Sequence, residues 1–514
     1  MSKTIIIIGA GLAGLSAALQ AAENGCNVKL VSSLPSERAQ SVMAEGGINA
    51  ALNTKDENDS PEEHFTDTIK AACGLADPNA VWGMTQAAPE LVHWLLKLGV
   101  KFNMSGYDDV DLRNFGGQKK KRTAFAQSDT GKQIMTAMID AVRRKEASGM
   151  VERFSHHSFL TLRLCGNICC GCVIRDEYSQ ETVELPGDAV IVATGGMHGL
   201  FENTTGSLSN TGEVTAELFR LGVPLANGEM IQYHPTTVKC GGKRMLISEA
   251  ARGEGGRLFA MKDGKQWYFM EEKYPELGNL MPRDITAREI WKVSHESEVF
   301  LDMTEISEEI ISNKLSGLAD DCMTYLHKDI RKEPVSVLPG IHYFMGGILV
   351  DEQHRTPIQN LCAAGECCAQ YHGANRLGGN SLLGALYGGR VAAKSACEQA
   401  DVVDLSCATQ IDFPPASQIS EIKQLNKVMQ ETMGVVRNEN TLLNGIQTVQ
   451  ALTGNLPLLG MAVLKSALAR KESRGAHWRE DYPKSNDDDY LKTTVARFDG
   501  KQIQISFVPV PERR

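Results

Sequence analysis

The feature that most constrains the fold is a glycine-rich turn between an apolar strand and an alanine-rich helix. In MSKTIIIIGAGLAGLSAALQAAENG, the β-branched run Ile5 to Ile8 is typical of a buried parallel strand. Gly9, Gly11 and Gly14 follow at the spacing G-x-G-x-x-G and open the helix. The first glycine bends the chain, the second lets the backbone approach a pyrophosphate, and the third packs helix against strand. With NVKLVSS as the second strand, this predicts a nucleotide-binding βαβ unit.

Later elements favour FAD over NAD as the nucleotide. Ser32 follows the second strand, where an acidic residue usually holds the ribose of NAD. DAVIVATGG, at 188–196, is a buried strand ending in small residues, and it resembles the second fingerprint of two-dinucleotide-binding flavoproteins. Glu366 in AAGECC resembles the acidic residue that meets FAD in their last strand. GGNSLLGALYGGR then begins a helix whose N-terminus suits negative charge on a reduced isoalloxazine.

A second stretch of small residues, SERAQSVMAEGGINAAL at 36–52, is predicted to lie along the cofactor, because small residues let the backbone come close. The residues expected to contact FAD are Gly9, Gly11, Gly14, Ser32, Ser41, Ala44, Gly46, Gly47, Ala193, Thr194, Gly195, Glu366, Ser381 and Leu382.

Composition excludes several classes of protein. A net charge of −10 argues against a nucleic-acid surface, and the one basic run, QKKKR at 118–122, is expected to be a solvated loop or partner patch. No continuous apolar stretch reaches the length of a membrane helix, and no export signal is visible. We therefore expect a cytoplasmic protein, peripheral to a membrane at most through partner subunits.

The 13 cysteines are expected to be reduced thiols, since no export signal accompanies them. Cys165, Cys169, Cys170 and Cys172 are adjacent or alternate, as strand residues would, and lack the regular spacing of an iron–sulfur site. We predict no metal site. The histidines that fit no motif, His156, His157, His198 and His354, are expected to be structural.

Several motifs together identify a family. AEGGINAAL, RTAFAQSDTG, IQYHPTT, SEAARGEGG, MPRDITAREI, IHYFMGGI, HGANRLGGNSLLGALYGGR and SRGAHWREDYP span essentially the whole chain. They closely resemble the flavoprotein subunits of fumarate reductase and succinate dehydrogenase, with L-aspartate oxidase as a near relative.

The resemblance implies an α/β fold with an FAD-binding Rossmann-like domain of the two-dinucleotide-binding type. This domain is expected at 1–226 and 345–404. An inserted α+β capping domain is expected at 227–344, where it would close over the substrate. A C-terminal helical region is expected at 405–514.

The resemblance also implies a site for a small dicarboxylate. His234, Ser248, His342 and Arg376 match the family's carboxylate-binding positions, with serine where the family usually has threonine. Arg283 matches the arginine that delivers a proton to fumarate while flavin N5 delivers hydride. Glu249 and Arg252, three apart in SEAARG, match the relay that reprotonates it.

One substitution separates the close relatives. L-Aspartate oxidases carry a glutamate before a Gly-Gly pair, where this chain has Phe115, and an apolar ring cannot pair with the ammonium of aspartate. An enzyme of a dicarboxylate, with fumarate reduction as the main prediction, is therefore favoured over L-aspartate oxidation. Aspartate oxidation, succinate dehydrogenation, reduction of another unsaturated acid and a non-enzymatic electron-carrier or assembly role stay as alternatives.

Gln40 bears on how FAD is held. Membrane-bound family members carry at this position a histidine that bonds covalently to FAD, and an amide cannot form that bond. The sequence thus predicts non-covalent FAD, which favours fumarate reduction over succinate oxidation. Electrons would come from an iron–sulfur subunit, a reduced free flavin or another soluble donor.

Overall fold

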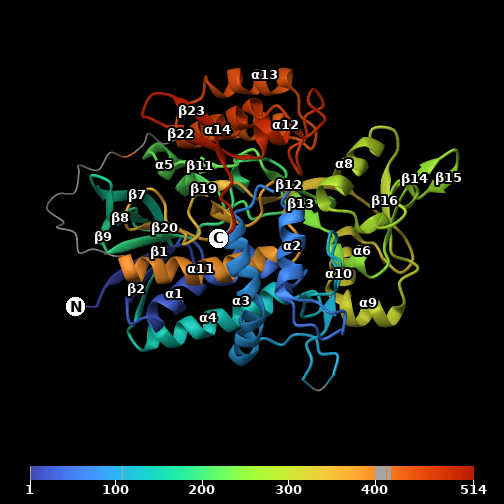
Figure 1. Ribbon diagram of the computed structural model, residues 1–514, viewed down its shortest axis with the longest axis horizontal. Coiled ribbons are helices and arrows are strands. Elements are labelled where there is room, and N and C mark those ends of the chain that lie inside the picture. The colour runs from blue at the N-terminus through green and yellow to red at the C-terminus, as the bar shows by residue number, and fades with distance from the viewer. Residues whose placement is uncertain (1, 107, 400–412, 414–417) are drawn as a thin grey trace.

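The computed structural model describes residues 2–106, 108–399, 413 and 418–514. Figure 1 shows a central body of helices and sheet, a lobe of strands and short helices on its right, and a helical layer at the top. The expected boundary between residues 404 and 405 lies outside the described residues. Of the described helices, none is long and apolar enough to cross a membrane.

A parallel sheet forms the centre of the body, with strand order β20-β10-β1-β2-β6. Its strands are β1 (Thr4–Ile8), β2 (Asn27–Ser32), β6 (Val151–Ser155), β10 (Ala189–Val192) and β20 (Leu361–Ala363). Parallel strands end at one edge of a sheet, so the loops after β1, β10 and β20 meet there. These are the loops that begin with Gly9, Ala193 and Ala364. The Rossmann-like α/β fold predicted for FAD binding is confirmed.

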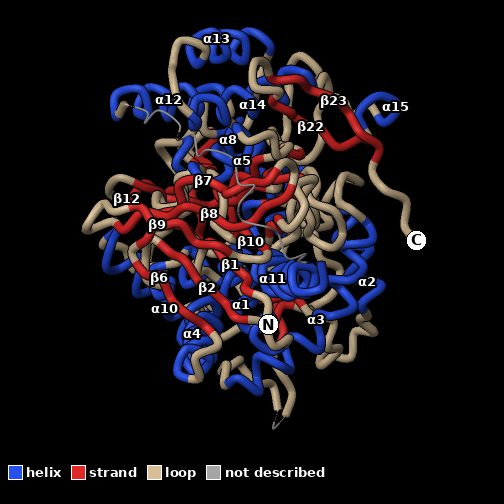
Figure 2. Tube along the Cα trace, turned by 90° about the vertical axis from the view of Figure 1, so that its left-hand side faces the viewer, coloured by secondary structure: helices blue, strands red, loops and turns tan. Residues whose placement is uncertain are grey.

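The two faces of this sheet are covered differently, as Figure 2 shows. Ile5 and Ile7 pack in one core with the helices, whereas Ile6 and Ile8 pack in another with a second sheet. This alternation follows from the two-residue period of a strand. The helices are α1 (Leu12–Glu23), α3 (Pro78–Leu98), α4 (Thr130–Ala147) and α11 (Asn380–Gln399), with α2 (Pro61–Ala71) beside α3. A small sheet, β3 (Ile48–Asn49), β4 (Leu112–Arg113) and β5 (Thr123–Ala124), lies nearby.

The antiparallel sheet on the opposite face comprises β7 (His157–Cys165), β8 (Ile168–Asp176) and β9 (Thr182–Pro186), and packs beside α5 (Glu213–Arg220). Cys169 and Cys172 are buried free thiols in β8, as expected for strand residues. Cys165 departs from the expectation of reduced thiols, because it is disulfide-bonded. Cys165 ends β7 beside the turn of the hairpin and is partly exposed, whereas Cys169 and Cys172 are buried.

The lobe between β12 and β18 carries two further sheets. The first has the order β13-β12-β18, from β12 (Ile231–Cys240), β13 (Lys243–Leu246) and β18 (Leu338–Phe344). The second has the order β15-β14-β16-β17, from β14 (Arg257–Lys262), β15 (Lys265–Trp267), β16 (Val299–Asp302) and β17 (Val335–Ser336). The helices are α6 (Glu249–Gly253), α7 (Phe269–Lys273), α8 (Arg283–Val293), α9 (Glu308–Lys314) and α10 (Ser316–Asp321). The lobe has an apolar core of its own, to which Phe115 of the body contributes.

The C-terminal region pairs with the strands that lead into and out of this lobe. Its helices are α12 (Ile419–Thr432), α13 (Glu439–Val449), α14 (Asn455–Ala469) and α15 (Asp487–Tyr490), followed by a hairpin of β22 (Lys492–Phe498) and β23 (Ile503–Pro509). The hairpin completes a sheet of order β21-β19-β11-β22-β23, which includes β11 (Leu225–Ala226), β19 (Gly347–Leu349) and β21 (Cys368–Ala369).

Candidate active site

One large cavity joins the carboxyl edge of the central sheet to the lobe between β12 and β18. Its volume is about 590 Å³. Every residue that the sequence predicts to contact FAD lines it, except Gly14. The predicted substrate residues and two of the catalytic ones also line it: His234, Ser248, His342, Arg376, Phe115, Glu249 and Arg283. Arg252 does not line the cavity and lies behind Glu249.

The turn between β1 and α1 needs its glycines. Gly9 has φ +110°, and a Cβ there would lie 2.3 Å from the carbonyl oxygen of Ala193. A Cβ on Gly14 would lie 1.8 Å from the oxygen of Gly9, so this glycine sets how closely helix and strand pack. The residue before α1, Gly11, has no side chain to cap the helix, and no acidic residue stands in the first turn. Its first N–H groups therefore suit an anion such as a pyrophosphate.

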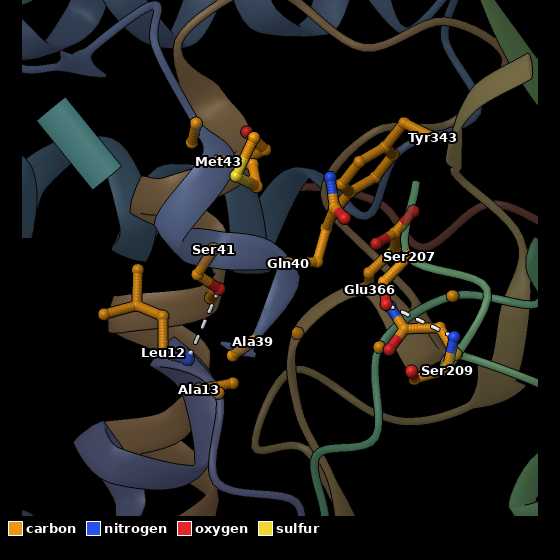
Figure 3. Close-up of a pocket in the computed structure, with 18 of the residues that line it drawn as sticks. Leu12, Ala13, Ala39, Gln40, Ser41, Met43, Ser207, Ser209, Tyr343 and Glu366 are labelled. Atoms are coloured by element: carbon orange, nitrogen blue, oxygen red, sulfur yellow. Dashed lines mark hydrogen bonds between the residues drawn. The ribbon is translucent and has the colours of Figure 1, made fainter. Parts of the chain in front are cut away.

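The stretch around Gln40 forms two short 3₁₀ turns, Ser36–Arg38 and Gln40–Met43. Ser41 faces the start of α1, where its hydroxyl accepts a hydrogen bond from Leu12 N at 3.4 Å. Figure 3 shows Gln40 extending into the cavity, between this turn and the loop that carries Ser207 and Ser209. The side chain at position 40, where the sequence comparison expects a linking histidine in membrane-bound relatives, is thus an amide.

Gly46 and Gly47, which follow this turn, lie at positions where neighbouring atoms leave no room for a side chain. A Cβ on Gly46 would lie 2.9 Å from the ring of Phe115, and one on Gly47 would lie 2.5 Å from the oxygen of Ala124. The backbone of this stretch is thereby held against the wall of the cavity. This is the close approach that its small residues predict.

The residues at the far side of the cavity also fit FAD. Glu366 is held in place because its Oε1 accepts a hydrogen bond from Phe344 N at 3.1 Å. Ser381 and Leu382 lie in the first turn of α11, so a second helix N-terminus faces the cavity. Ser32 Oγ is buried and has no hydrogen-bond partner within the described part of the chain, as expected of a group that awaits a ligand.

Two histidines lie side by side at the substrate end. His234 on β12 and His342 on β18 have ring centroids 5.1 Å apart. Burial lowers the pKa of His234 well below its ordinary value, and Arg283 and His342 lower it further. Burial and then Arg283 and Arg376 do the same to His342. Both imidazoles are therefore neutral at pH 7, and the positive charge of the site comes from its arginines.

Arg376 is a buried cation without a carboxylate partner among the described residues. Burial lowers its pKa to about 9, with Arg283 as the next cause. Its guanidinium lies 4.3 Å over the ring of Tyr343, and its Nε has no hydrogen-bond partner in the described structure. Such an unsatisfied guanidinium fork in a dry pocket is suited to a carboxylate.

Arg283, Glu249 and Arg252 form a continuous chain of charges. Arg283 is the first residue of α8, directly after Pro282, and donates to Glu249 Oε2 from Nε at 2.8 Å and from Nη2 at 2.5 Å. Arg252 Nη2 lies 3.5 Å from the other oxygen, which also accepts from Gly116 N. Burial raises the pKa of Glu249, but the two arginines outweigh it and hold that pKa below its ordinary value.

Ser248 and Phe115 complete the substrate end. Ser248 caps α6, with its hydroxyl accepting from Ala250 N, and it also faces the cavity. Phe115 is 2 % exposed and packs on the glycine backbone of Gly46. No carboxylate therefore stands at position 115 to pair with an ammonium group.

Sequence reasoning missed several groups that line the cavity, among them Glu45, Arg244 and the strand start His157 to Phe159. Burial, then Asp321, raises the pKa of Glu45 to about 8, so it is a neutral acid at pH 7. A carboxyl within the small, apolar stretch AEGG was a signal that could have revealed it. His157 was expected to be structural, but it opens β7 and faces the cavity. His198 and His354 are buried, and each forms a hydrogen bond with a protein group, which fits a structural role.

The fold and the cavity define an FAD-binding oxidoreductase. The family described as FAD binding domain matches residues 4–382, and the family described as fumarate reductase flavoprotein C-term matches residues 452–513.

The chain is 38% identical to the succinate dehydrogenase flavoprotein subunit of Bacillus subtilis, over 100% of this chain and 98% of the relative. It is 32% identical to the 8-methylmenaquinol:fumarate reductase flavoprotein subunit of Wolinella succinogenes, over 100% of this chain and 92% of the relative. A solved structure of E. coli quinol fumarate reductase FrdA is similar, with a TM-score of 0.90 and 27% identity. The match covers 99% of this chain and 97% of that structure's chain.

The chain belongs to the family of succinate dehydrogenase and fumarate reductase flavoproteins. It is an FAD-dependent oxidoreductase that acts on CH–CH bonds.

Proposed function

We propose that the chain reduces fumarate to succinate with non-covalently bound FAD. The observation that carries this proposal is the charge chain from Arg252 through Glu249 to Arg283, which ends beside the two neutral histidines in the cavity. It supplies a proton route to a site rich in carboxylate-binding groups. An electron-carrier or assembly role would need no such arrangement.

Bound FAD would supply the hydride that adds to one alkene carbon. Arg376 and His342 hold one carboxylate of the substrate, and His234 and Ser248 hold the other. These contacts orient the double bond and draw electron density toward the carboxylates. Arg283 delivers the proton to the second alkene carbon, and Glu249 and Arg252 return a proton to it. All of these groups except the partly exposed His342 are buried, which limits the access of water to the transfer.

Proton loss from an arginine is ordinarily costly, because its pKa is high. At this site Arg283 shares a buried pocket with Arg252 and Arg376, and both of these have pKa values lowered by burial and by the charge of Arg283. Of these three arginines, Arg283 is the one that both lines the cavity and contacts Glu249. This place between the substrate end and the relay supports Arg283 as the acid.

Gln40 supports both the mode of FAD binding and the direction of reaction. Its amide extends into the cavity but cannot form a histidyl bond to the cofactor. Without that bond the flavin is expected to be a better electron donor. FAD is therefore held by the contacts of the cavity wall alone, and fumarate reduction is favoured over succinate oxidation.

We also propose the domain division at 1–226 with 345–404, 227–344 and 405–514. The segment 227–344 would close over the substrate and bring Arg283 to it, which excludes water. Relatives of the chain are named as subunits, which supports an electron-donor partner such as an iron–sulfur subunit.

The test is fumarate-dependent oxidation of reduced methyl viologen, with succinate-dependent dye reduction measured in parallel. We expect fumarate turnover well above a free-FAD control and above the rate of succinate oxidation. Activity equal to free FAD would refute the proposal, and efficient oxidation of L-aspartate would assign the chain to the other relative. On acid precipitation the yellow colour should leave with the supernatant, and a yellow pellet would contradict non-covalent binding.

A further inference from the structure

At the substrate end of the cavity, the cation Arg244 has no part in the proposed mechanism. Arg244 lies on β13, is partly exposed, and lines the same cavity as His234 and His342. Burial alone accounts for the lowering of its pKa, and no carboxylate among the described residues pairs with it. A half-buried guanidinium without a counter-charge is an unusual feature, because cations in protein interiors are normally paired.

The backbone places Arg244 next to the two histidines. His234 lies directly opposite Gly340 in the pairing of β12 with β18, so their side-chain positions share a face of the sheet. His342 lies at the register shift between Ile341 and Tyr343, and its ring is 5.1 Å from that of His234. A Cβ on Gly340 would lie 2.7 Å from Arg244 Cδ and 2.9 Å from its Nε. The stem of Arg244 thus fills the space that Gly340 leaves beside the imidazole pair.

The guanidinium is held by one edge only. Its Nε donates to Thr237 Oγ1, and its Nη2 donates to the carbonyl oxygens of Thr237 at 3.1 Å and Leu338 at 3.4 Å. Within the described chain, Nη1 has no acceptor. The group is therefore fixed in orientation while N–H donors stay available, which is the arrangement that carboxylate binding by arginine requires.

Arg244 is more exposed than the two arginines that line the substrate end of the cavity, Arg283 and Arg376. Arg283 is 6 % exposed and Arg376 is 3 % exposed, whereas Arg244 is only partly buried. Tyr325, from the same lobe, lines the cavity as well and is 59 % exposed. Of these three arginines, Arg244 is therefore the one that an anion can reach from solvent before the buried end of the site.

We propose that Arg244 forms an outer carboxylate subsite on the access path, where it binds one carboxylate of an incoming dicarboxylate and passes it to His342 and Arg376. The inference rests on the proposed function, because it concerns the substrate of that same site. Arg244 would then help to select dicarboxylates over monocarboxylates. A monocarboxylate has only one charge, so it cannot contact Arg244 with one carboxylate and the inner groups with another. No proton or electron moves in this step.

The experiment compares Arg244→Gln, Arg244→Lys and the matched control Lys239→Gln in the FAD-loaded full chain. Lys239 lies directly opposite Arg244 in the pairing of β12 with β13, is exposed, and does not line the cavity. Each glutamine variant removes one positive charge from nearly the same place. A general electrostatic attraction would therefore weaken equally in both, whereas loss of a specific subsite affects only Arg244→Gln.

For Arg244→Gln we expect kcat/KM for fumarate to fall about tenfold while kcat stays within about twofold, and the salt dependence of kcat/KM to flatten. Preference for fumarate over an unsaturated monocarboxylate should fall as well. Arg244→Lys should recover most of the loss, and Lys239→Gln should behave as wild type. An unchanged kcat/KM, an equal fall in kcat, or the same loss in Lys239→Gln would overturn the proposal.

A second readout separates this inference from the proposed function. The thermal shift produced by succinate or malonate in the FAD-loaded protein should need about tenfold more ligand in Arg244→Gln. If wild type is stabilised by these dicarboxylates but reduces no fumarate, the proposed function fails while the subsite is still tested. If Arg244→Gln binds both ligands as wild type does, the subsite is refuted whatever the activity.

Discussion

Replacing Glu45 by glutamine should stabilise the protein at neutral pH. Burial, the neighbouring charge of Asp321 and that of Asp129 raise the pKa of Glu45 from 4.5 to about 8, although Arg113 and a hydrogen bond with Ser248 oppose them. The folded protein therefore keeps the Glu45 proton over a range of pH in which the unfolded chain releases it. Glutamine resembles the neutral acid in shape but has no proton to release.

The sign and size follow from linkage. Between pH 4.5 and about 8 the folded state binds more protons at Glu45 than the unfolded state, so stability falls as pH rises. Each pH unit in this window costs about 1.4 kcal/mol, and above it the loss is constant. At pH 7 the Glu45→Gln variant should thus be more stable than wild type by about 3 kcal/mol, while near pH 5 the two should agree within about 1 kcal/mol.

The assay is guanidinium unfolding of wild type, Glu45→Gln and Glu37→Gln at pH 5, 6, 7, 8 and 9. Glu37 is an exposed carboxylate on the preceding turn, so its variant controls for the loss of one acid. The separation between Glu45→Gln and wild type should grow up to about pH 8 and then stay constant. A separation that is the same at all five values would refute a neutral Glu45.

Three further outcomes are expected. Arg283→Lys should lower the turnover of fumarate by about 10²- to 10⁴-fold, the contribution of a positioned acid, while succinate still raises the thermal midpoint; loss of both would contradict a proton-donor role. Glu249→Gln should cost about 3 kcal/mol of unfolding free energy, since it leaves buried arginines uncompensated. Because Arg283 and Arg252 hold the pKa of Glu249 below 4.5, this contribution is present above pH 4.5 and lost as pH falls through the folded pKa, so acid unfolding curves should converge at low pH. Phe115→Glu should weaken succinate binding in thermal-shift titrations, and unchanged affinity would remove Phe115 from the substrate site.

Local rules predict the cofactor end of the site well. The run before Gly9, the glycine spacing and the alanine-rich segment after Gly14 each favour one structure, so strand, turn and helix follow from neighbouring residues. The order of the later glycine-rich segments then places Ala193 and Glu366 at the same sheet edge. These predictions needed only short-range pattern and the parallel arrangement of strands.

The chemistry that depends on distant segments could not be predicted in the same way. The raised pKa of Glu45 comes from its burial and then from Asp321, which belongs to α10 far along the chain. The position of Arg244 depends on the absence of a side chain at Gly340 in the paired strand β18. His157 lines the cavity because β7 starts beside the sheet edge, which no motif in its own neighbourhood indicates.

The sheet that joins β11 and β19 to β22 has a consequence for how the chain is made. Leu225 and Ala226 pair on one side with β19 and on the other with Val495 and Ala496 of β22. A nascent chain that has emerged only as far as α11 can build the central sheet and the lobe, but β11 then has an open edge where β22 will pair. The junction from which the lobe departs is thus completed only after the C-terminal hairpin has been synthesised. During translation the cofactor end of the site can form early, whereas the relative placement of substrate and cofactor groups is settled late.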